Sequence, residues 1–189
     1  MVAARFRRAP RPRRGSAALI HEPRASRPAR GGTARIERGA AIARGQITET
    51  QLFDERYVAI PGTDPKQYLT DYVDLTDRLL PPIQDPLQRS DPRIIFCVAW
   101  ARGGYLPTHN PNYRQPQGKD PVWNAAHCRN RRLFKDRAVQ KVARNTKPFL
   151  LQTYRRDMGG GNFVLMKDLS SPIWVRGRYW GAFRIGYRQ

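Results

Sequence analysis

The sequence contains little cysteine and histidine, and this scarcity argues against several classes of protein. Two cysteines, Cys97 and Cys128, and three histidines occur in 189 residues. The cysteines stand far apart, and no CxxC, CxxCH or HxxxH spacing is present. The pattern therefore favours neither a disulfide-stapled secreted scaffold nor a structural metal site. A reducing compartment is expected.

Long apolar runs and catalytic patterns are missing as well. There is no run of about 18 apolar residues, the length that a membrane-spanning helix needs. The basic N-terminus has no apolar core, so it does not read as a secretory signal. We therefore expect a cytoplasmic chain. No Ser-His-Asp or Cys-His-Asn arrangement and no paired carboxylates in an apolar setting have sequence support.

Positive charge is abundant and unevenly spread. Lysine and arginine number 35 against 15 acidic residues, a net charge of +20. Residues 1–45 hold twelve Arg, no Lys and only Glu22 and Glu37 as acids. Such a segment cannot bury enough apolar surface to offset its ordering entropy, so residues 1–39 are predicted to be a disordered Arg/Pro/Gly-rich arm. One alternative function follows, a nucleic-acid or other polyanion-binding protein driven by this arm.

Residues 40–92 are predicted to form an N-terminal helical segment that leads into the domain. Apolar and aromatic side chains recur at helical spacing over residues 66–80, which predicts an amphipathic helix with one face to bury. Pro81 and Pro82 are expected to end this helix. Residues 83–93 then form a polar connector.

The stretch 93–110 is the centre of the predicted fold. The apolar run 94–100 predicts a buried strand. Two glycines then turn the chain into a short second strand at 105–110, which completes a hairpin. After a polar loop, a long helix is predicted over 122–144, with Asp120 as its N-cap.

Three more strands are predicted in the last forty residues, at 149–156, 163–174 and 179–188. The glycine-rich turn 157–162 joins the first two, because glycine supplies the positive φ angles of a tight hairpin. The element order predicts an α+β fold over residues 93–189. Its mostly antiparallel five-stranded sheet would carry the helices on one face.

Six strings of sequence carry a more specific signal. They are LFDERYVAIPGTDPKQY, LTDRLLPPIQDPL, GYLPTHN, DPVWNAAHCRNRRLFKDR, ARNTKPFLLQTYRRDMGGG and FVLMKDLSSPIWVRGRYWGAFRIGYR. In this order they resemble the PAS/Cache-like sensory domain of bacterial methyl-accepting chemotaxis proteins, over about residues 40–188. The resemblance implies a sensory or regulatory module in signal transduction that binds a small ligand and is not an enzyme. Its implied partners are chemotaxis signalling components, and a homodimer is compatible with it.

The chain departs from that family in three respects. It contains no methylated coiled-coil hairpin, no HAMP-like linker and no membrane anchor. The arm at 1–39 has no counterpart, and His127 stands where the resemblance predicts Asn. The resemblance thus implies the sensing end of a chemoreceptor without its transmitting end.

Candidate ligand-binding residues gather where predicted elements meet loops. Tyr105, His109 and Asn110 lie where a strand opens onto a polar loop, a common place for the polar groups of a small-molecule pocket. Arg129 and Arg131 have side chains that can grip a carboxylate or phosphate in a bidentate manner. The alternatives are that His109 and Asn110 bond loop backbone and that the arginines form a solvated face.

Two further candidates, Tyr154 and Asp168, lie on the predicted strands. Asp168 interrupts an apolar strand and is a candidate ion-pair partner for one of the arginines at 129–132. We expect the ligand between the central helix and the sheet, near His109, Arg131 and Tyr154.

A haem or metal sensor is the second alternative, because four side chains could serve as ligands. They are Cys97, His109, His127 and Cys128. Only His127 and Cys128 are adjacent, and neighbours on a helix point about 100° apart, so they rarely share one ion. Buried structural cysteines fit the pattern better, and the sequence assigns no cofactor.

Overall fold

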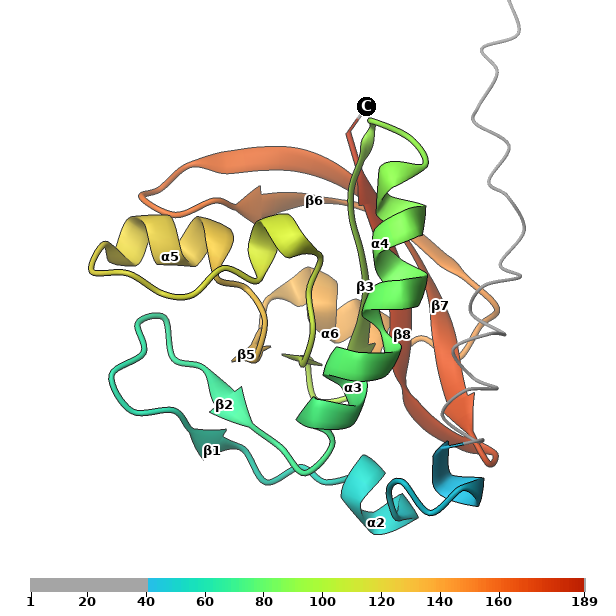
Figure 1. The fold of residues 1–189 in the computed structure, drawn as a ribbon. Helices are drawn as coiled ribbons and strands as arrows, with labels where there is room; N and C mark the ends of the chain where they lie inside the picture. The colour runs from blue at the N-terminus through green and yellow to red at the C-terminus, as the bar shows by residue number, and fades with distance from the viewer. Residues whose placement is uncertain (1–40, 189) are drawn as a thin grey trace, which may run out of the picture.

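The fold is an α+β arrangement whose elements follow one another closely along the chain. The computed structural model describes residues 41–188, so the predicted arm at 1–39 lies outside it. In chain order the elements are α2 (Glu49–Leu52), β1 (Val58–Ala59), β2 (Tyr68–Leu69), α3 (Val73–Leu79), α4 (Pro81–Arg89), β3 (Ile94–Ala101), β4 (Tyr105–Leu106), the 3-10 helix η1 (Pro111–Tyr113), α5 (Pro121–His127), β5 (Arg132–Leu133), α6 (Arg137–Ala143), β6 (Leu150–Asp157), β7 (Phe163–Val175) and β8 (Arg178–Tyr187) (Figure 1).

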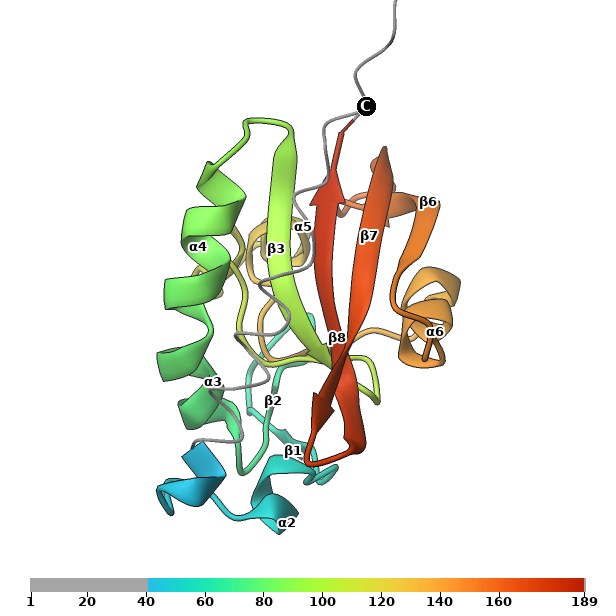
Figure 2. The ribbon, with the colours of Figure 1, turned by 90° about the vertical axis from the view of Figure 1, so that its right-hand side faces the viewer.

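The main sheet has four antiparallel strands in the order β3-β8-β7-β6. Figure 2 shows them side by side, with α3 and α4 beside β3 and α6 beside β6. The three C-terminal strands form the predicted meander. Its glycine turn closes with a bond from the Asn162 amide to the Gly159 carbonyl, 3.0 Å long. Two small separate sheets, β1-β2 and β4-β5, complete the strand pairing.

The sheet differs from the expected one in having four strands rather than five. Tyr105–Leu106 does not return along β3; it pairs with Arg132–Leu133 as β4-β5. Gly104 causes the departure, because its φ of +80° turns the chain away from the sheet and a side chain there would collide with the Phe134 carbonyl. The Phe134 amide donates to the Gly104 carbonyl at 2.9 Å, which fixes this close approach.

The first face of the sheet carries the main apolar core. Cys97 and Ala99 of β3 and Phe183 of β8 point from this face, and they belong to one buried cluster with Leu75 of α3 and Ile83 of α4. Alternation along each strand sends every second side chain to this side. The N-terminal helices α2, α3 and α4 thus share one core with the sheet.

The opposite face of the sheet lies under residues 105–144, which we call the covering segment. Phe96 and Trp100 of β3 and Met166 of β7 point to this side and pack with Leu106 and other side chains of the covering segment. Helices therefore lie on both faces, not on one as expected. Val139 of α6 packs with Phe96 and Trp100 on this side, whereas Leu75 of α3 and Ile83 of α4 belong to the core of the first face.

The predicted helix over 122–144 is interrupted. The N-terminal part is correct, since Asp120 accepts from the Val122 amide at 2.8 Å and caps α5. Helix α5 ends at His127, and Arg131 has a φ of 60°, a left-handed conformation that breaks a helix. Asp136 then caps α6 by accepting from a backbone amide. The spacing of apolar residues did not reveal that the strand β5 (Arg132–Leu133) separates the two helices.

The helix predicted over residues 66–80 is also wrong in extent. Tyr68–Leu69 is the strand β2, and the helix α3 begins only at Val73. The two prolines expected to end it instead begin α4, because a proline at the first helical position loses no hydrogen bond. The predicted polar connector at 83–93 is therefore largely helical.

Gly181 provides a stability test of the close contact between β3 and β8. A Cβ at this position would collide with the backbone carbonyl of Trp100, so neither strand can give way without losing ladder bonds. We expect Gly181→Ala to lower the unfolding free energy in urea by about 3 kcal/mol. Gly118→Ala is the matched control, because nothing lies within 4 Å of its added methyl group. Equal stability of the two variants would contradict the strand pairing.

Candidate functional site

Charged and ring side chains gather on the sheet face beneath the covering segment. Tyr154 and Arg156 of β6 point to this side, as do Asp168 of β7 and Arg184 of β8, since they alternate with residues of the first face. Arg156, Asp168 and Arg184 are at most 3% exposed. A sheet face that buries this much charge needs a partner for each charged group.

Asp168 and Arg184 form a buried ion pair at the centre of this face. The Arg184 Nε donates to Asp168 Oδ2 at 3.1 Å, and the terminal nitrogen donates to the same oxygen. Gln152 adds a third bond to that oxygen, 3.0 Å long. Burial by itself would lower the pKa of Arg184, but the Asp168 carboxylate outweighs burial and the pKa is raised. Asp168 therefore has an arginine partner, although not one of those at 129–132.

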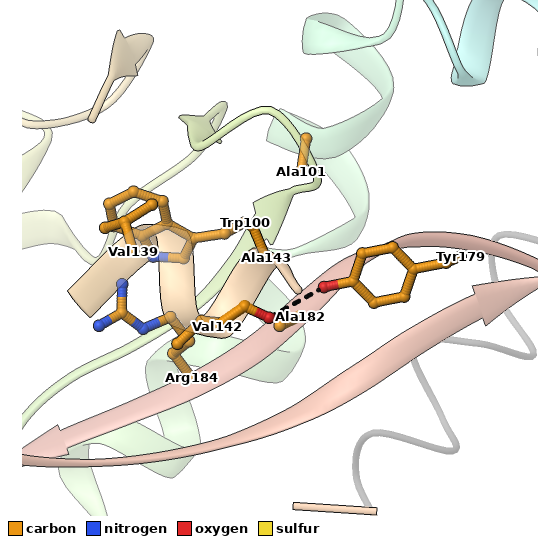
Figure 3. A pocket seen from close by; sticks show the side chains of 8 residues that line it. All are labelled: Trp100, Ala101, Val139, Val142, Ala143, Tyr179, Ala182 and Arg184. Atoms are coloured by element: carbon orange, nitrogen blue, oxygen red, sulfur yellow. Dashed lines mark hydrogen bonds between the residues drawn. The ribbon is translucent and has the colours of Figure 1, made fainter. Parts of the chain in front are cut away.

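A small cavity lies next to Arg184 (Figure 3). Its volume is about 10 Å³, and its lining includes Trp100, Val139 and Tyr179. Tyr179 donates a hydrogen bond from its hydroxyl to the Val142 carbonyl, 3.2 Å long, at one end of this cavity. A second cavity near Tyr57 and Trp180 has the same volume. About one water molecule fits such a space, so neither cavity accommodates an organic ligand.

Four side chains, Arg156, Phe96, Tyr113 and His109, form what we call the Arg156 cluster, in which both Arg156 and His109 lie against the rings of Phe96 and Tyr113. The Arg156 guanidinium carbon lies 5.1 Å from the ring centroid of Phe96 and 4.3 Å from that of Tyr113. The His109 ring lies 6.0 Å from the Phe96 ring and 4.9 Å from the Tyr113 ring. The cluster thus joins the strands β3 and β6 to the chain around η1. None of the three Arg156 nitrogens has a hydrogen-bond partner among residues 41–188.

The electrostatics of this cluster are strongly positive. Burial lowers the pKa of His109 well below its usual value, and Arg156 and Arg129 add repulsion. Burial and then the charges of Arg156 and Arg132 lower the pKa of Arg129 to about 9. The pKa of Arg156 is also lowered, first by burial and then by other arginines. His109 is therefore neutral at physiological pH.

Of the predicted site residues, His109, Arg129 and Tyr154 lie around this cluster. Arg129 donates to the carbonyls of Ala125 and Asp157, at 3.0 and 2.9 Å. Burial raises the pKa of Tyr154, and its ring lies 5.7 Å from the Arg184 guanidinium carbon.

The side chain and backbone amide of Asn110 are bonded within the protein. Its Oδ1 accepts from the Cys97 amide at 2.8 Å, and its Nδ2 donates to Asp85 on α4 at 3.0 Å. Its backbone amide donates to His109 Nδ1 at 2.7 Å. Asn110 therefore ties the covering segment to β3 and α4. The same bond leaves Nε2 as the donor nitrogen of the neutral His109 ring.

The side chains of the remaining predicted residues, Tyr105 and Arg131, are bonded to the N-terminal elements instead. The Tyr105 hydroxyl donates to the Tyr68 carbonyl at 2.6 Å, and Arg131 donates to Asp77 of α3 at 2.8 Å. Both connect the covering segment to the N-terminal elements. The structure does not bring them together with the Arg156 cluster.

The four potential haem or metal ligands are dispersed. Within residues 41–188, no three His, Cys, Asp or Glu side chains form a group that could hold a metal ion. Cys97 and Cys128 are both buried. The His127 ring stacks on Trp123, with centroids 4.7 Å apart, rather than facing a cysteine.

Sequence reasoning missed Arg156, Phe96 and Tyr113. A signal for Arg156 was present, because strict alternation along β6 places it on the same face as Tyr154. Its burial could not be read from the strand alone, because Tyr113 covers it from a loop far away in the sequence.

Comparisons with known proteins add no family assignment. A scan against protein-family models, a search of curated proteins and a search of solved structures each found no match for this chain. None of the helices within residues 41–188 has the length and apolar character to cross a bilayer.

The Asp168–Arg184 pair provides a stability prediction. Asp168→Asn removes the charge and leaves the buried Arg184 uncompensated, so we expect a loss of about 3–5 kcal/mol of unfolding free energy in urea. Asp91→Asn, at the surface ion pair with Arg93, is the control and should change stability little. A loss at Asp168 no larger than at Asp91 would contradict the role of the buried pair.

His109 predicts a dependence of stability on pH. Its pKa is depressed in the folded state, so below its unfolded value of about 6.5 the unfolded chain takes up a proton that the folded chain does not. Unfolding free energy should therefore fall as the pH drops from 7 to 5, by up to about 1.4 kcal/mol per pH unit. His109→Gln should flatten this slope, measured as urea midpoints, whereas His127→Gln should retain it.

Proposed function

We propose that the chain is a PAS/Cache-like sensory domain of methyl-accepting chemotaxis type. It binds a small ligand beneath the covering segment and is not an enzyme. The observation that carries the proposal is Arg156, a buried cation with no hydrogen-bond partner among the described residues. A buried unpaired charge raises the free energy of the empty protein. A ligand that pairs with this charge recovers part of that free energy when it binds.

The contacts of the covering segment support a regulatory rather than a purely structural role. Asp77 of α3 accepts hydrogen bonds from both Thr108 and Arg131 of the covering segment. Asp85 of α4 likewise accepts a hydrogen bond from the Asn110 side chain of the covering segment. A ligand that repacks the covering segment therefore changes the contacts of α3 and α4. It biases that change only by binding the two arrangements with different affinity.

The six strings that resemble chemoreceptor sensory domains support the same proposal. In a receptor of this kind the change at α3 and α4 would be passed to chemotaxis signalling components in the cytoplasm. The net charge of +20 supports polyanion binding by residues 1–39 as the alternative function.

A thermal-shift screen of the full chain tests the proposal. Amino acids, organic acids, purines and haem form the panel. A ligand at a hundred times its Kd stabilises the folded state by about 2.7 kcal/mol, and in a chain of this size that raises Tm by about 5–10 °C. We expect at least one class of compound to do so. We also expect it to change hydrogen exchange in α3 and α4.

Two results would contradict the proposal. A panel without any stabilising compound would leave no ligand-binding function. A compound that stabilises the chain without altering exchange in α3 and α4 would leave binding but remove the regulatory role.

A further inference from the structure

We propose that the Arg156 cluster binds a small organic carboxylate, whose two oxygens accept hydrogen bonds from the Arg156 guanidinium. This inference rests on the proposed ligand-binding function and names the chemical class of its ligand. It starts from the one described arginine that is almost fully buried and has no partner for any of its nitrogens.

Within residues 41–188, no carboxylate forms a hydrogen bond with Arg156. The groups that act most strongly on its charge, after burial itself, are the phenols of Tyr113 and Tyr154 and the cations of Arg184 and Arg188. No carboxylate is among them. Arg184, the other buried arginine of this face, has its charge satisfied by Asp168 at 3.1 Å. Of these two buried arginines of the sheet face, only Arg156 has no carboxylate partner among the described residues.

The chemistry of the cluster favours a carboxylate over a phosphate. A guanidinium presents parallel N–H groups that match the two oxygens of a carboxylate. The remaining walls are the rings of Phe96 and Tyr113, which suit an apolar ligand body. A phosphate dianion would bring more charge into this apolar setting than one guanidinium offsets.

His109 adds a neutral donor to the same cluster. Its Nδ1 accepts from the Asn110 amide at 2.7 Å, so the ring proton resides on Nε2. Because the ring contacts both Phe96 and Tyr113, it lies within the set of side chains that surrounds Arg156. A neutral donor assists an anion without adding a second buried charge.

Tyr113 controls access to Arg156. It belongs to η1, only three residues long, and the chain after η1 is largely exposed. The Tyr113 ring covers the guanidinium at 4.3 Å, whereas Phe96 is fixed in the sheet. The ligand therefore reaches Arg156 by displacing the Tyr113 ring. This displacement moves the part of the covering segment that adjoins Asn110.

The first experiment uses the full chain without substitution. Acetate, butyrate and benzoate are compared with butyramide and benzamide, and with inorganic phosphate, by thermal shift and calorimetry at constant chloride and ionic strength. We expect at least one carboxylate to raise Tm by several degrees, while its amide and phosphate do not. The amide keeps the shape of the acid and lacks its charge, so the comparison isolates the anion.

Substitutions at Arg156 and its neighbour complete the test. Arg156→Met should weaken carboxylate binding by about 10- to 100-fold without lowering Tm of the empty protein, because it removes an unpaired buried charge. Arg156→Lys, which keeps the charge but loses the fork, should weaken binding less. Arg155→Met is the matched control: Arg155 is exposed and lies over the Phe163 ring at 4.7 Å. It should bind as the unsubstituted chain does.

The outcomes separate this inference from the proposed function. Carboxylate binding that survives Arg156→Met, or equal stabilisation by the amide or by phosphate, would overturn the inference. If a neutral metabolite of the broader panel binds and no carboxylate does, the ligand class is wrong and the small-ligand function stands. If no compound binds at all, both are overturned. Loss of folding in Arg156→Met would itself mark the residue as structural, and the comparison of acid with amide would then decide alone.

Discussion

The structure depends on how one sheet face accommodates buried cations. Arg156 and Arg184 project from neighbouring parts of this face, and among residues 41–188 Asp168 is the one buried carboxylate that this face provides to balance them. Asp168 takes Arg184, and Gln152 supports the pair. Arg156 is left with ring faces as its contacts, and an aromatic quadrupole offsets only part of the desolvation of a guanidinium. The Asp168–Arg184 pair thus balances the charge at the centre of this face. Arg156, at its edge, has no carboxylate partner among the described residues.

The two faces of the sheet hold their layers by different interactions. Helices α2 to α4 cover the first face through apolar contacts, a non-directional attachment that is hard to shift. The covering segment is attached partly through directional bonds, which join Asn110 to β3 and α4 and Arg131 to Asp77 of α3. Directional bonds have discrete alternative arrangements. The covering segment is therefore the layer of this fold in which a bound molecule can select one arrangement over another.

Local rules predicted the parts of this fold that depend on neighbouring residues. The C-terminal meander and the Asp120 cap were read correctly because alternation and capping act within a few residues. The interrupted helix over 122–144 and the misplaced strand β4 depend on contacts between distant segments, as between Gly104 and Phe134. The site followed the same division. His109 and Arg129 were predicted from local chemistry, whereas Arg156 became a candidate only once its burial under Tyr113 was known.

The same unpaired charge that weakens the empty protein would give the proposed carboxylate its affinity. Burying a guanidinium without a partner has a free-energy cost that folding has already met, so an anion that arrives there does not have to desolvate an exposed arginine. The desolvation of the anion itself is the main remaining cost of binding. Because His109 is neutral and the other walls are rings, the site offsets one negative charge only. Selectivity then follows from the charge balance between the ligand and Arg156. A neutral analogue leaves the guanidinium charge uncompensated, and a dianion exceeds it, so a monoanion best matches the charge that the fold leaves open.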